Sequence, residues 1–594
     1  MVEQNVFCGP ELRRTKPESC DVFSPFRTPD GTCNNLNDPL LGASFSEHER
    51  LLPPDYSDGV SELRRAADGG NLPSARLVSD AANLDSIRRS SCNTVLFTNF
   101  GQLTDHDFAF TPITKGTNGS TIPCCIREVM ENQNLLHPQC APIAIPVDDP
   151  FYSAFGETCM EFVRSSPADR CNFGPREQLN EVTSFMDVSA VYGSTKSRAD
   201  SLRTFTDGLL VTQLSRDGQE LLGIDLEPED GCTALETPRE TLFCFKTGDV
   251  RVNEQEGLTV VSTALAREHN RLARMLGRLN PGWDDERIYQ ETRRIVIAKI
   301  QHITYNEFLP LALGPALVKR VGLLPQGNGK QTDDYDPTIN PRVTNEFTTA
   351  AFRFGHSMLP TNLWRINTNG TTNARELSAA FFNPFPLYME GGATRLLLGM
   401  MQSAPKVDNI FTREVSGRLF REEKQFGLDL VAINIQRGRD HGIPGYVAVR
   451  RACGFPKVTS FSQLSEFTDP QVLQVFKRIY RNVNDIDLFA GGLAEKPLPG
   501  ALLGPTLSCI IADQFLRGKI GDRFWFEYKD SPGAFTTDQL REIHQVSMAR
   551  VLCDNFPEIR TIQRWPFQVV TAFNPMLQCS SKCIPNFNLE LWKE

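Results

Sequence analysis

The spacing of hydrophobic and polar residues predicts helices in several separate parts of this chain. Apolar side chains recur every three or four positions, as on one face of an amphipathic helix, while strand-like alternation is scarce. The segments with helical spacing are residues 81–110, 257–279, 284–308, 342–357, 415–430 and 537–551. The pattern predicts a mainly α-helical protein with little β structure.

The parts between these segments are long and irregular. The first 90 residues are rich in Pro, Asn, Asp and Gly, and include the turn cluster PPDYSDG at 53–59. Residues 114–180 are again irregular and rich in Cys and Pro. We find no internal repeat and no low-complexity linker. The sequence therefore predicts one loop-rich body, with the N-terminal region as an extended arm wrapped on it.

Composition narrows the class of protein. The chain has 594 residues, of which 40% are hydrophobic and 23% charged, an ordinary balance for a globular protein. Its net charge is −10 and no basic run stands out, so nucleic acid is not an expected partner. No stretch approaches the roughly 18 consecutive apolar residues of a transmembrane helix, so no membrane span is expected.

The cysteine count points to an oxidising compartment. Sixteen cysteines without the repeated C-x-x-C pairs of zinc ribbons indicate a disulfide framework. Two glycosylation sequons, at Asn118 and Asn369, agree with a secreted, extracellular protein. The start lacks the basic and apolar regions of a signal peptide, so we expect that a leader was removed or is missing from this sequence. The alternative is a cytosolic protein with many free thiols.

The chain has eight histidines, which allows a search by elimination. His48 lies in a charged segment and is expected to be solvated, whereas His269 lies in an amphipathic helix and is expected to be a hydrogen-bonded structural residue. Neither H-E-x-x-H nor G-x-S-x-G occurs, which excludes the zinc hydrolases and serine hydrolases with those motifs. Two histidines remain with neighbours that suggest chemistry, His106 and His356.

His106 lies in the segment FGQLTDHDF. On a helix, Gln102 and His106 are four residues apart and share one face. Asp105 and Asp107 flank the imidazole and must point in other directions, and two carboxylates are costly to bury unless each has a partner. The alternative is a solvated helix C-terminal turn.

A second segment, TSFMDVS, carries oxygen atoms at alternate positions. These are the side chains of Thr183, Asp187 and Ser189, with the carbonyl of Phe185 between them. In an extended chain they would face one side, and hard oxygen ligands suit Ca²⁺, with Asp107 completing the set. Alternation in a surface strand would look the same.

The third segment is AFRFGH, which ends at His356. His356 ends a helical stretch and follows Phe354 and Gly355. Because glycine has no side chain, it leaves room for a flat cofactor close to the histidine. A proximal haem ligand needs an acceptor for its other ring nitrogen, and Asn434 in NIQRGRDHG is a candidate. The alternative is a buried core histidine.

Together these segments resemble the animal haem peroxidases. The matching pieces, which occur in the family's order over residues 20–590, are FGQLTDHD, TSFMDVSAVYGS, TGDVRVNE, REHNRLA, FRFGH, NIQRGRDHGIPGY and GDRFWFE. The resemblance implies a large, mainly α single-domain fold with haem buried in a helical core. It also implies an N-terminal arm over residues 1–19 and a catalytic domain over 20–594.

The resemblance assigns roles around the haem. His106 would be the distal acid and base, Gln102 would hold water or halide, and Arg251 would supply positive charge. His356 would ligate the haem iron, with Asn434 accepting its Nδ1 proton.

The resemblance also implies how the haem and a metal are held. Asp105 and Glu254 match the carboxylates that become ester-linked to haem. Candidates for propionate contacts and their support are Arg353, Arg437 and Arg439. The implied Ca²⁺ ligands are Asp107, Thr183, Phe185, Asp187 and Ser189.

Some disulfides follow from the resemblance as well. The pairs that match by position are Cys20–Cys33, Cys232–Cys244, Cys453–Cys509 and Cys553–Cys579. Two more would form among Cys124, Cys125, Cys140 and Cys159, with the pairing left open. No family equivalents are clear for Cys8, Cys92, Cys171 and Cys583, and an intermolecular bridge is one possible use.

The expected function is a haem peroxidase that reduces hydrogen peroxide and oxidises halides, pseudohalides, or phenolic and tyrosyl donors. Some family members have a methionine directly after the ester glutamate, which forms a sulfonium link; here that residue is Gln255. We therefore expect thiocyanate, iodide or bromide as donors, with chloride poor, in host defence or in crosslinking of matrix or egg coat. The alternative is a secreted cell-adhesion protein on a peroxidase scaffold, although no Arg-Gly-Asp or Lys-Gly-Asp tripeptide occurs.

Overall fold

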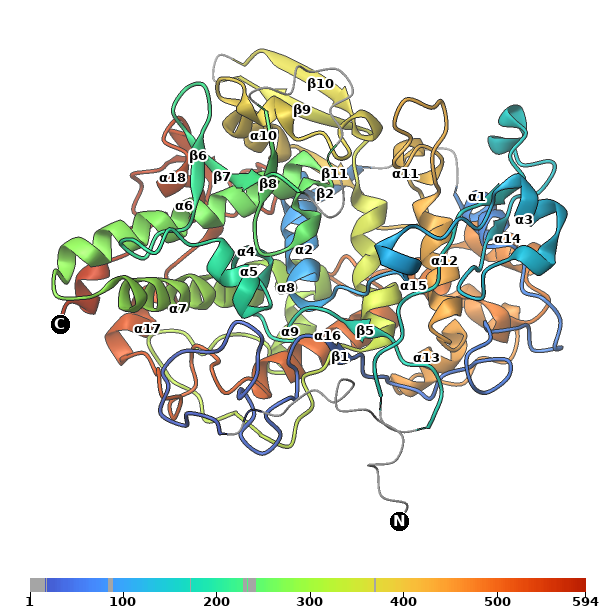
Figure 1. Ribbon diagram of the computed structural model, residues 1–594, viewed down its shortest axis with the longest axis horizontal. Coiled ribbons are helices and arrows are strands. Elements are labelled where there is room, and N and C mark those ends of the chain that lie inside the picture. The colour runs from blue at the N-terminus through green and yellow to red at the C-terminus, as the bar shows by residue number, and fades with distance from the viewer. Residues whose placement is uncertain are drawn as a thin grey trace.

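The computed structural model describes residues 17, 19–83, 89–170, 173–227, 232, 242–367 and 370–594, and these form a mainly α-helical body. In Figure 1, α2 lies at the centre, with α6 and α7 on one side and α12 and α15 on the other. The helices are α1 Ala75–Ala82, α2 Val95–Phe108, α3 Arg127–Glu131, α4 Ser189–Tyr192, α5 Lys196–Ser201, α6 Glu256–Leu279, α7 Asp285–Ile303, α8 Leu309–Leu313, α9 Pro315–Arg320, α10 Gly392–Met400, α11 Arg413–Ser416, α12 Leu430–Asp440, α13 Tyr446–Ala452, α14 Pro470–Ile479, α15 Leu488–Leu493, α16 Pro505–Ile520, α17 Thr537–Ile543 and α18 Met548–Asn555.

The strands are short and, within the named sheets, pair only in antiparallel ladders of two or three. The pairs are β1 (Ser46–Glu47) with β5 (Leu179–Asn180), β2 (Arg89–Thr94) with β11 (Ser403–Pro405), β3 (Ile143–Ala144) with β4 (Cys159–Met160), β9 (Asn362–Ile366) with β10 (Thr372–Glu376), and β12 (Thr561–Gln563) with β13 (Met576–Gln578); the three-stranded sheet is β6 (Thr212–Leu214), β7 (Glu220–Asp225) and β8 (Cys244–Lys246). The predicted fold class, mainly α with little β, is confirmed.

Two of the predicted helices are confirmed at full length. The segment 257–279 is α6, and 284–308 is α7 followed by the π-helical turn Thr304–Phe308. The segment 342–357 is helical only in its later part, as a π turn over Phe347–Ala351 and a 3-10 helix, η9, over Phe352–Met358.

Three other predicted helices are interrupted. The segment 81–110 contains the end of α1, strand β2 and helix α2. The segment 537–551 divides into α17 and α18, because Ser547 caps a new helix by accepting from the Arg550 N–H. The prediction of a helix over 415–430 is wrong: Phe420 and Glu422 have positive φ, and the chain folds back so that Leu419 pairs with Leu428. The spacing of apolar residues does not reveal such a reversal of the chain.

Aromatic side chains pack around α2 and fix its place in the core. Phe97 stacks on Phe308 with ring centroids 4.4 Å apart, and Phe100 lies 4.8 Å from Phe567. Such pairs add about 0.5–1.5 kcal/mol beyond the area that they bury. The helix is therefore held on its apolar side, and Gln102 and Asp105 are among its least buried residues.

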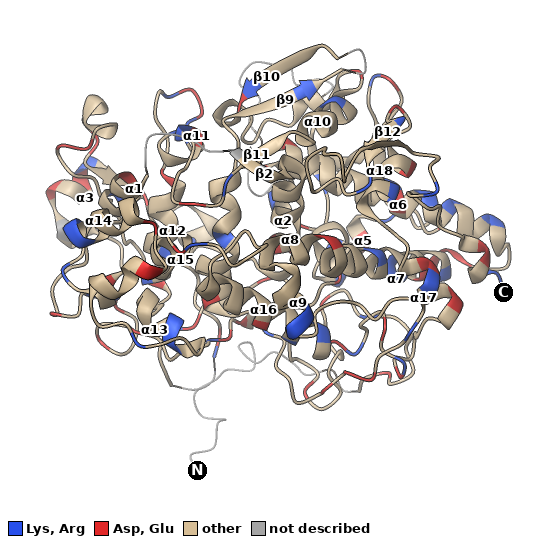
Figure 2. Ribbon diagram, turned by 180° about the vertical axis from the view of Figure 1, so that it is seen from behind, with Lys and Arg blue, Asp and Glu red and all other residues tan. Residues whose placement is uncertain are grey.

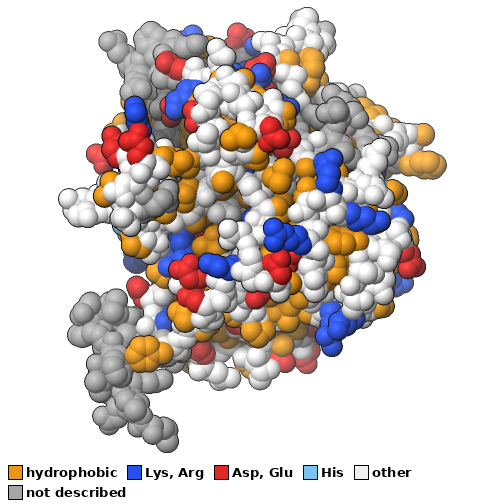
Figure 3. Space-filling view, turned by 90° about the vertical axis from the view of Figure 1, so that its right-hand side faces the viewer, with side chains coloured by type: hydrophobic (Ala, Val, Ile, Leu, Met, Phe, Trp, Pro, Cys, Tyr) orange, Lys and Arg blue, Asp and Glu red, His pale blue; other side chains and the backbone are white. Residues whose placement is uncertain are grey.

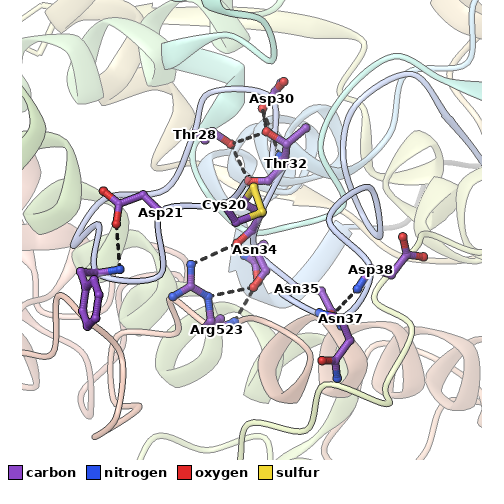
Figure 4. Close-up of a disulfide and its surroundings, with 12 residues drawn as sticks. Cys20, Asp21, Thr28, Asp30, Thr32, Asn34, Asn35, Asn37, Asp38 and Arg523 are labelled. Carbon is purple, nitrogen blue, oxygen red and sulfur yellow. Dashed lines mark hydrogen bonds between the residues drawn. A yellow bond between two sulfur atoms is a disulfide. The ribbon is translucent and has the colours of Figure 1, made fainter. Parts of the chain in front are cut away.

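The N-terminal loops are fastened to the C-terminal third of the chain. Figure 4 shows the disulfide of Cys20 beside Asn34 and Arg523. Arg523 donates to the carbonyls of Cys33 and Asn34, and the buried Asp522 accepts from Arg27 and Asn34. A region with little periodicity is thus ordered by contacts almost 500 residues away in sequence.

Six disulfides form within the described residues. The four predicted pairs, Cys20–Cys33, Cys232–Cys244, Cys453–Cys509 and Cys553–Cys579, are all present. The pairing that the sequence left open is Cys124–Cys140 and Cys125–Cys159. Cys92 and Cys583 are exposed free thiols, while Cys8, Cys171 and the sequon at Asn369 lie outside the described residues.

Charges of both signs are spread over the molecule, as Figure 2 shows, and the face drawn in Figure 3 mixes small apolar groups with both signs of charge. Within the described ranges, no helix is long and apolar enough to cross a membrane.

Candidate functional site

A cavity of about 220 Å³ lies between α2 and η9, and it brings together residues that the sequence analysis singled out. Gln102, Asp105 and His106 line it from α2, and His356 lines it from η9. The remaining predicted residues on its wall are Arg251, Glu254 and Arg353, with Gln255 beside them. The cavity therefore joins two imidazoles, two carboxylates and two guanidinium groups from segments far apart in sequence.

His106 is buried and has unusual surroundings. Its Nδ1 has no hydrogen-bond partner among the described residues, and the nearest carboxylate oxygens are Asp249 Oδ1 at 3.8 Å from Nδ1 and Glu254 Oε2 at 4.0 Å from Nε2. Burial, followed by the charge of Arg251, lowers the pKa of His106 to about 3. The imidazole is therefore neutral at ordinary pH and able to accept a proton.

Arg251 is held in place by a residue that the sequence analysis missed. The Asp249 carboxylate accepts from Arg251 Nε at 2.8 Å and from Nη2 at 2.6 Å. Nη2 also donates to the carbonyl of Ala109 at 3.0 Å, and the guanidinium lies over the Phe110 ring. Asp249 lies two residues before Arg251 in the segment TGDVRVNE, and a 3-10 turn over Val250–Asn253 brings both side chains together.

The two predicted ester carboxylates both face the cavity. Glu254 Oε2 accepts from Gln102 Nε2 at 3.1 Å. Asp105 Oδ1 is buried and has no hydrogen-bond partner within the described chain. Burial raises the pKa of Asp105 to about 6, although Arg251 and Arg353 oppose the shift. A buried carboxylate with an unsatisfied oxygen is rare in proteins unless it has a functional use.

His356 is held by a short relay of hydrogen bonds. Its Nδ1 lies 2.8 Å from Asn434 Nδ2, and Asn434 Oδ1 accepts from Arg353 Nη1 at 2.6 Å. Burial lowers the pKa of His356 to about 3, so the ring is neutral, as metal ligation requires. The expected donation from His356 to the amide oxygen needs the amide to turn over and Arg353 to take another acceptor.

The other two predicted arginines lie away from the cavity lining. Arg437 forms an ion pair with Asp440 at 3.1 Å and lies over the Phe162 ring. Arg439 forms a two-point ion pair with Asp487, with contacts of 3.0 and 2.7 Å. Both guanidinium groups brace helix α12, which carries Asn434.

The predicted calcium ligands form a compact oxygen cluster on the far side of α2, which we define as Asp107, Thr183, Phe185, Asp187 and Ser189. Ser189 Oγ donates to Asp107 Oδ1 at 3.0 Å, and Thr183 Oγ1 donates to Asp187 Oδ2 at 2.9 Å. The segment is bent rather than extended, with Val188 at a φ of 59°. All five residues are buried.

The oxygen cluster has the chemistry of a cation site. Burial and the neighbouring carboxylate of Asp187 raise the pKa of Asp107, and burial raises the pKa of Asp187 although the charges of Arg27 and Arg293 oppose that shift. Within the described residues no group of three or more His, Cys, Asp or Glu could hold a metal, and this cluster instead combines two carboxylates with hydroxyl and carbonyl oxygens. Such a set fits Ca²⁺ better than a transition metal.

The cavity also fits the cofactor that the sequence suggests. A Cβ placed at Gly355 would meet no protein atom within 4 Å, so a flat ring can approach the chain beside His356. Asp105 and His106, each with a buried side-chain atom that has no partner among the described residues, line the cavity together with Phe97, Phe308 and other aromatic groups. Apolar walls with a few polar groups suit a haem with its two carboxylates.

Two of the histidines outside the cavity are structural. His269 Nδ1 pairs with the Tyr192 hydroxyl at 3.0 Å and its Nε2 with the Gly208 carbonyl at 2.8 Å, which confirms the prediction. The prediction that His48 is solvated is wrong. It is 3% exposed, and its Nε2 lies 2.7 Å from the Thr111 hydroxyl, because a distant segment covers the charged run.

Comparison with known proteins identifies the family. A family model described as "Animal haem peroxidase" matches residues 26–567. The chain is 39% identical to chorion peroxidase of Drosophila melanogaster, over 97% of this chain and 72% of that protein, and 36% identical to mouse myeloperoxidase, over 97% and 80%. It is also 39% identical to the human peroxidasin homologue, over 96% of this chain but 39% of that longer protein.

Solved structures agree. Peroxidase A of Dictyostelium discoideum superposes with a TM-score of 0.75 and 29% identity, covering 91% of this chain and 99% of that one. A rice fatty acid alpha-dioxygenase shares the fold, with a TM-score of 0.69 at 19% identity, over 92% and 87%. With the site and the family match in agreement, this chain belongs to the animal haem peroxidase family and is a peroxidase.

Proposed function

We propose that this protein is a haem-dependent peroxidase that reduces hydrogen peroxide and oxidises small anionic or phenolic donors. The observation that carries the proposal is the pair of neutral imidazoles, the buried His106 and the half-buried His356, which line one cavity from two different helices. Among the described residues, His356 has an amide partner, whereas His106 has a nitrogen without a hydrogen-bond partner and lies near the Arg251 guanidinium group. This asymmetry suits one ligand and one acid–base residue.

His356 would hold the haem iron, which supplies the oxidising centre when bound. Asp105 and Glu254 would form the ester links, and Arg353, supported by Arg437, would pair with the propionates. If Arg353 turns to a cofactor carboxylate, the oxygen of Asn434 becomes available to accept the Nδ1 proton of His356, which raises the donor strength of the imidazole.

His106 would move the proton during peroxide cleavage. Its neutral imidazole accepts a proton from one peroxide oxygen and returns it to the leaving oxygen, which departs as water. Arg251, fixed by Asp249, stabilises the negative charge that develops on that oxygen, and the low dielectric of the cavity strengthens the effect. Gln102 would hold water or a halide in the same space.

The oxygen cluster would bind Ca²⁺. Its ligand Asp107 directly follows His106 on α2, so the ion would fix the helix segment that carries the distal residues. We also propose that residues 20–594 form one catalytic domain and that residues 1–19 are an arm.

Gln255 bears on the donor. Because no methionine follows Glu254, no sulfonium link forms, and we propose thiocyanate, iodide or bromide as good donors and chloride as a poor one. We also propose phenolic donors, which include the tyrosines of other proteins. The relative named chorion peroxidase favours a role in crosslinking an egg coat or matrix. Six disulfides and the exposed sequon at Asn118 support a secreted protein.

The first test is the absorption spectrum of the purified protein before and after acid-acetone extraction. A Soret band that stays with the protein supports haem and both esters. A band that moves to the solvent keeps the peroxidase proposal and removes the covalent links. No Soret band after addition of haem and Ca²⁺ to the folded protein contradicts the proposal and favours a cell-adhesion role on this scaffold.

A further inference from the structure

Gln255 sits between the long helix α6 and the distal side of the cavity. It is 3% exposed and precedes the first residue of α6. Its Oε1 accepts the N–H of Gly257 at 2.7 Å, which caps the helix. Its Nε2 donates to Asn99 Oδ1 at 2.6 Å and to Gln102 Oε1 at 2.8 Å. Every hydrogen-bonding atom of the amide group thus has a partner.

The orientation of this amide follows from the chemistry of its partners. A backbone N–H only donates, so the contact with Gly257 requires the oxygen of Gln255. The NH₂ group must then face α2. On that helix Asn99 Nδ2 donates to the Val95 carbonyl at 3.0 Å, which independently turns the Asn99 oxygen toward Gln255. Two backbone groups therefore fix the direction of the whole relay.

Close packing keeps the relay in register. A Cβ at Gly257 would lie 2.4 Å from Asn99 Oδ1, so only glycine lets the start of α6 approach α2 this closely. Glu256, which lies between Gln255 and Gly257, is fully buried and pairs with Arg365 and Arg375. The helix start that carries Gln255 is thus anchored from both sides.

The relay decides which end of Gln102 faces the cavity. Because Gln255 donates to its oxygen, Gln102 directs its NH₂ group away from Gln255. One N–H of that group goes to Glu254 Oε2 at 3.1 Å, and the second has no partner among the described residues. An N–H aimed into a cavity attracts anions and the oxygen of water, whereas an amide oxygen would repel anions.

We propose that Gln255 is a positioning residue that keeps the Gln102 N–H turned toward the cavity, and that it thereby sets the affinity of the distal side for small anions. The proposal rests on the proposed function, since the anion meets the haem-loaded cavity. It assigns Gln255 an active part in donor binding rather than only the absence of a sulfonium link.

The test compares the haem-loaded wild-type protein with Gln255→Glu and Gln255→Leu, using azide as the probe. A glutamate still accepts the Gly257 N–H and caps α6, but it cannot donate to Gln102, whose amide would then turn over. Leucine removes both functions without adding charge. The readouts are the azide dissociation constant from the Soret shift and the thermal midpoint, and the matched control is Asp284→Ala, which removes the cap of α7 instead.

We expect azide to bind about tenfold more weakly to Gln255→Glu than to the wild type, because a tenfold change in affinity corresponds to the loss of one hydrogen bond to a charged group. The thermal midpoint of this variant should stay near that of the wild type. Gln255→Leu, or Gln255→Ala if the leucine variant does not load haem, should also weaken azide binding and lower the midpoint. Asp284→Ala should lower the midpoint alone.

Three outcomes would overturn the proposal. Unchanged azide binding in the glutamate variant would make Gln255 a helix cap only. Weaker binding in the glutamate variant but not in the neutral variants would assign the effect to added charge. A wild-type protein that takes up no haem would overturn the proposed function and this proposal with it, which distinguishes the two failures.

Discussion

Asp249 and Arg251 form a two-point ion pair beside the cavity, whose wall includes Arg251, with oxygen–nitrogen distances of 2.8 and 2.6 Å. Burial alone would raise the pKa of Asp249, but the guanidinium of Arg251 outweighs it and holds that pKa below its usual range. Asp249 Oδ1 also lies 3.8 Å from His106 Nδ1. One carboxylate therefore acts on both Arg251 and His106.

We predict that Asp249→Asn slows the reaction with hydrogen peroxide. The amide keeps the shape of the side chain but loses the charge that holds Arg251, so we expect a loss of about 10- to 100-fold, less than the roughly 10²–10³-fold cost of deleting a charge-stabilising donor outright. Stopped-flow kinetics of the Soret change measures it. An unchanged rate at a normal haem content would contradict the role given to Asp249.

Replacement of His106 by leucine should remove proton transfer while leaving haem bound. We expect the rate with peroxide to fall by about 10²–10⁴-fold, the usual contribution of a general acid–base residue. The measurement is the same stopped-flow reaction, with His269→Gln as a control at a buried histidine outside the cavity. A fall of equal size in the control would point to lost folding instead.

Calcium removal should destabilise the protein. Binding to the folded state alone adds about 2.7 kcal/mol at a free ion concentration 100-fold above Kd. We therefore expect chelation to lower the thermal midpoint of the wild type and to have little effect on Asp187→Asn, which lacks one carboxylate of the oxygen cluster. Calorimetry with and without chelator measures both. Equal shifts in the two proteins would mean that the ion binds elsewhere.

Acid should destabilise the fold partly through His269. Burial lowers its pKa from 6.5 to about 4, although the Gly208 carbonyl opposes the shift. Between these values the unfolded chain binds a proton that the folded protein does not, so stability is retained above pH 6.5 and falls as the pH drops toward 4. The contribution is on the order of 3 kcal/mol. Urea unfolding at pH 7 and pH 5 should show a smaller loss for His269→Gln than for the wild type.

Donor preference gives a fifth prediction. At neutral pH we expect steady oxidation of thiocyanate, iodide and bromide and little of chloride. Peroxide-dependent chlorination of a trap such as taurine, compared with triiodide formation, measures the ratio. Sustained chlorination near neutral pH would contradict the argument from Gln255.

The part of the distal side that lies within one helix could be predicted from the sequence. Gln102 and His106 are one turn apart, and helical geometry alone puts them on one face. Asp249 could not be found this way, since its relation to Arg251 depends on a short 3-10 turn and its relation to His106 on the packing of two distant segments.

The errors have the same physical origin. His48 reads as solvated from its neighbours, but Thr111 and the carbonyl of Val343 cover it. The predicted helix over 415–430 has apolar spacing, but the positive φ angles near Phe420 reverse the chain. Local pattern reports what a segment prefers, and long-range contacts decide what it does.

Helix α2 carries the cavity residues Gln102 and His106 on one side and the cluster ligand Asp107 on another. One residue more or fewer between Gln102 and His106 would rotate everything beyond it by about 100°. Such a change would turn the imidazole away from the cavity and the carboxylate away from the oxygen cluster at once. Among related sequences, this stretch should therefore keep its length as strictly as it keeps His106 and Asp107.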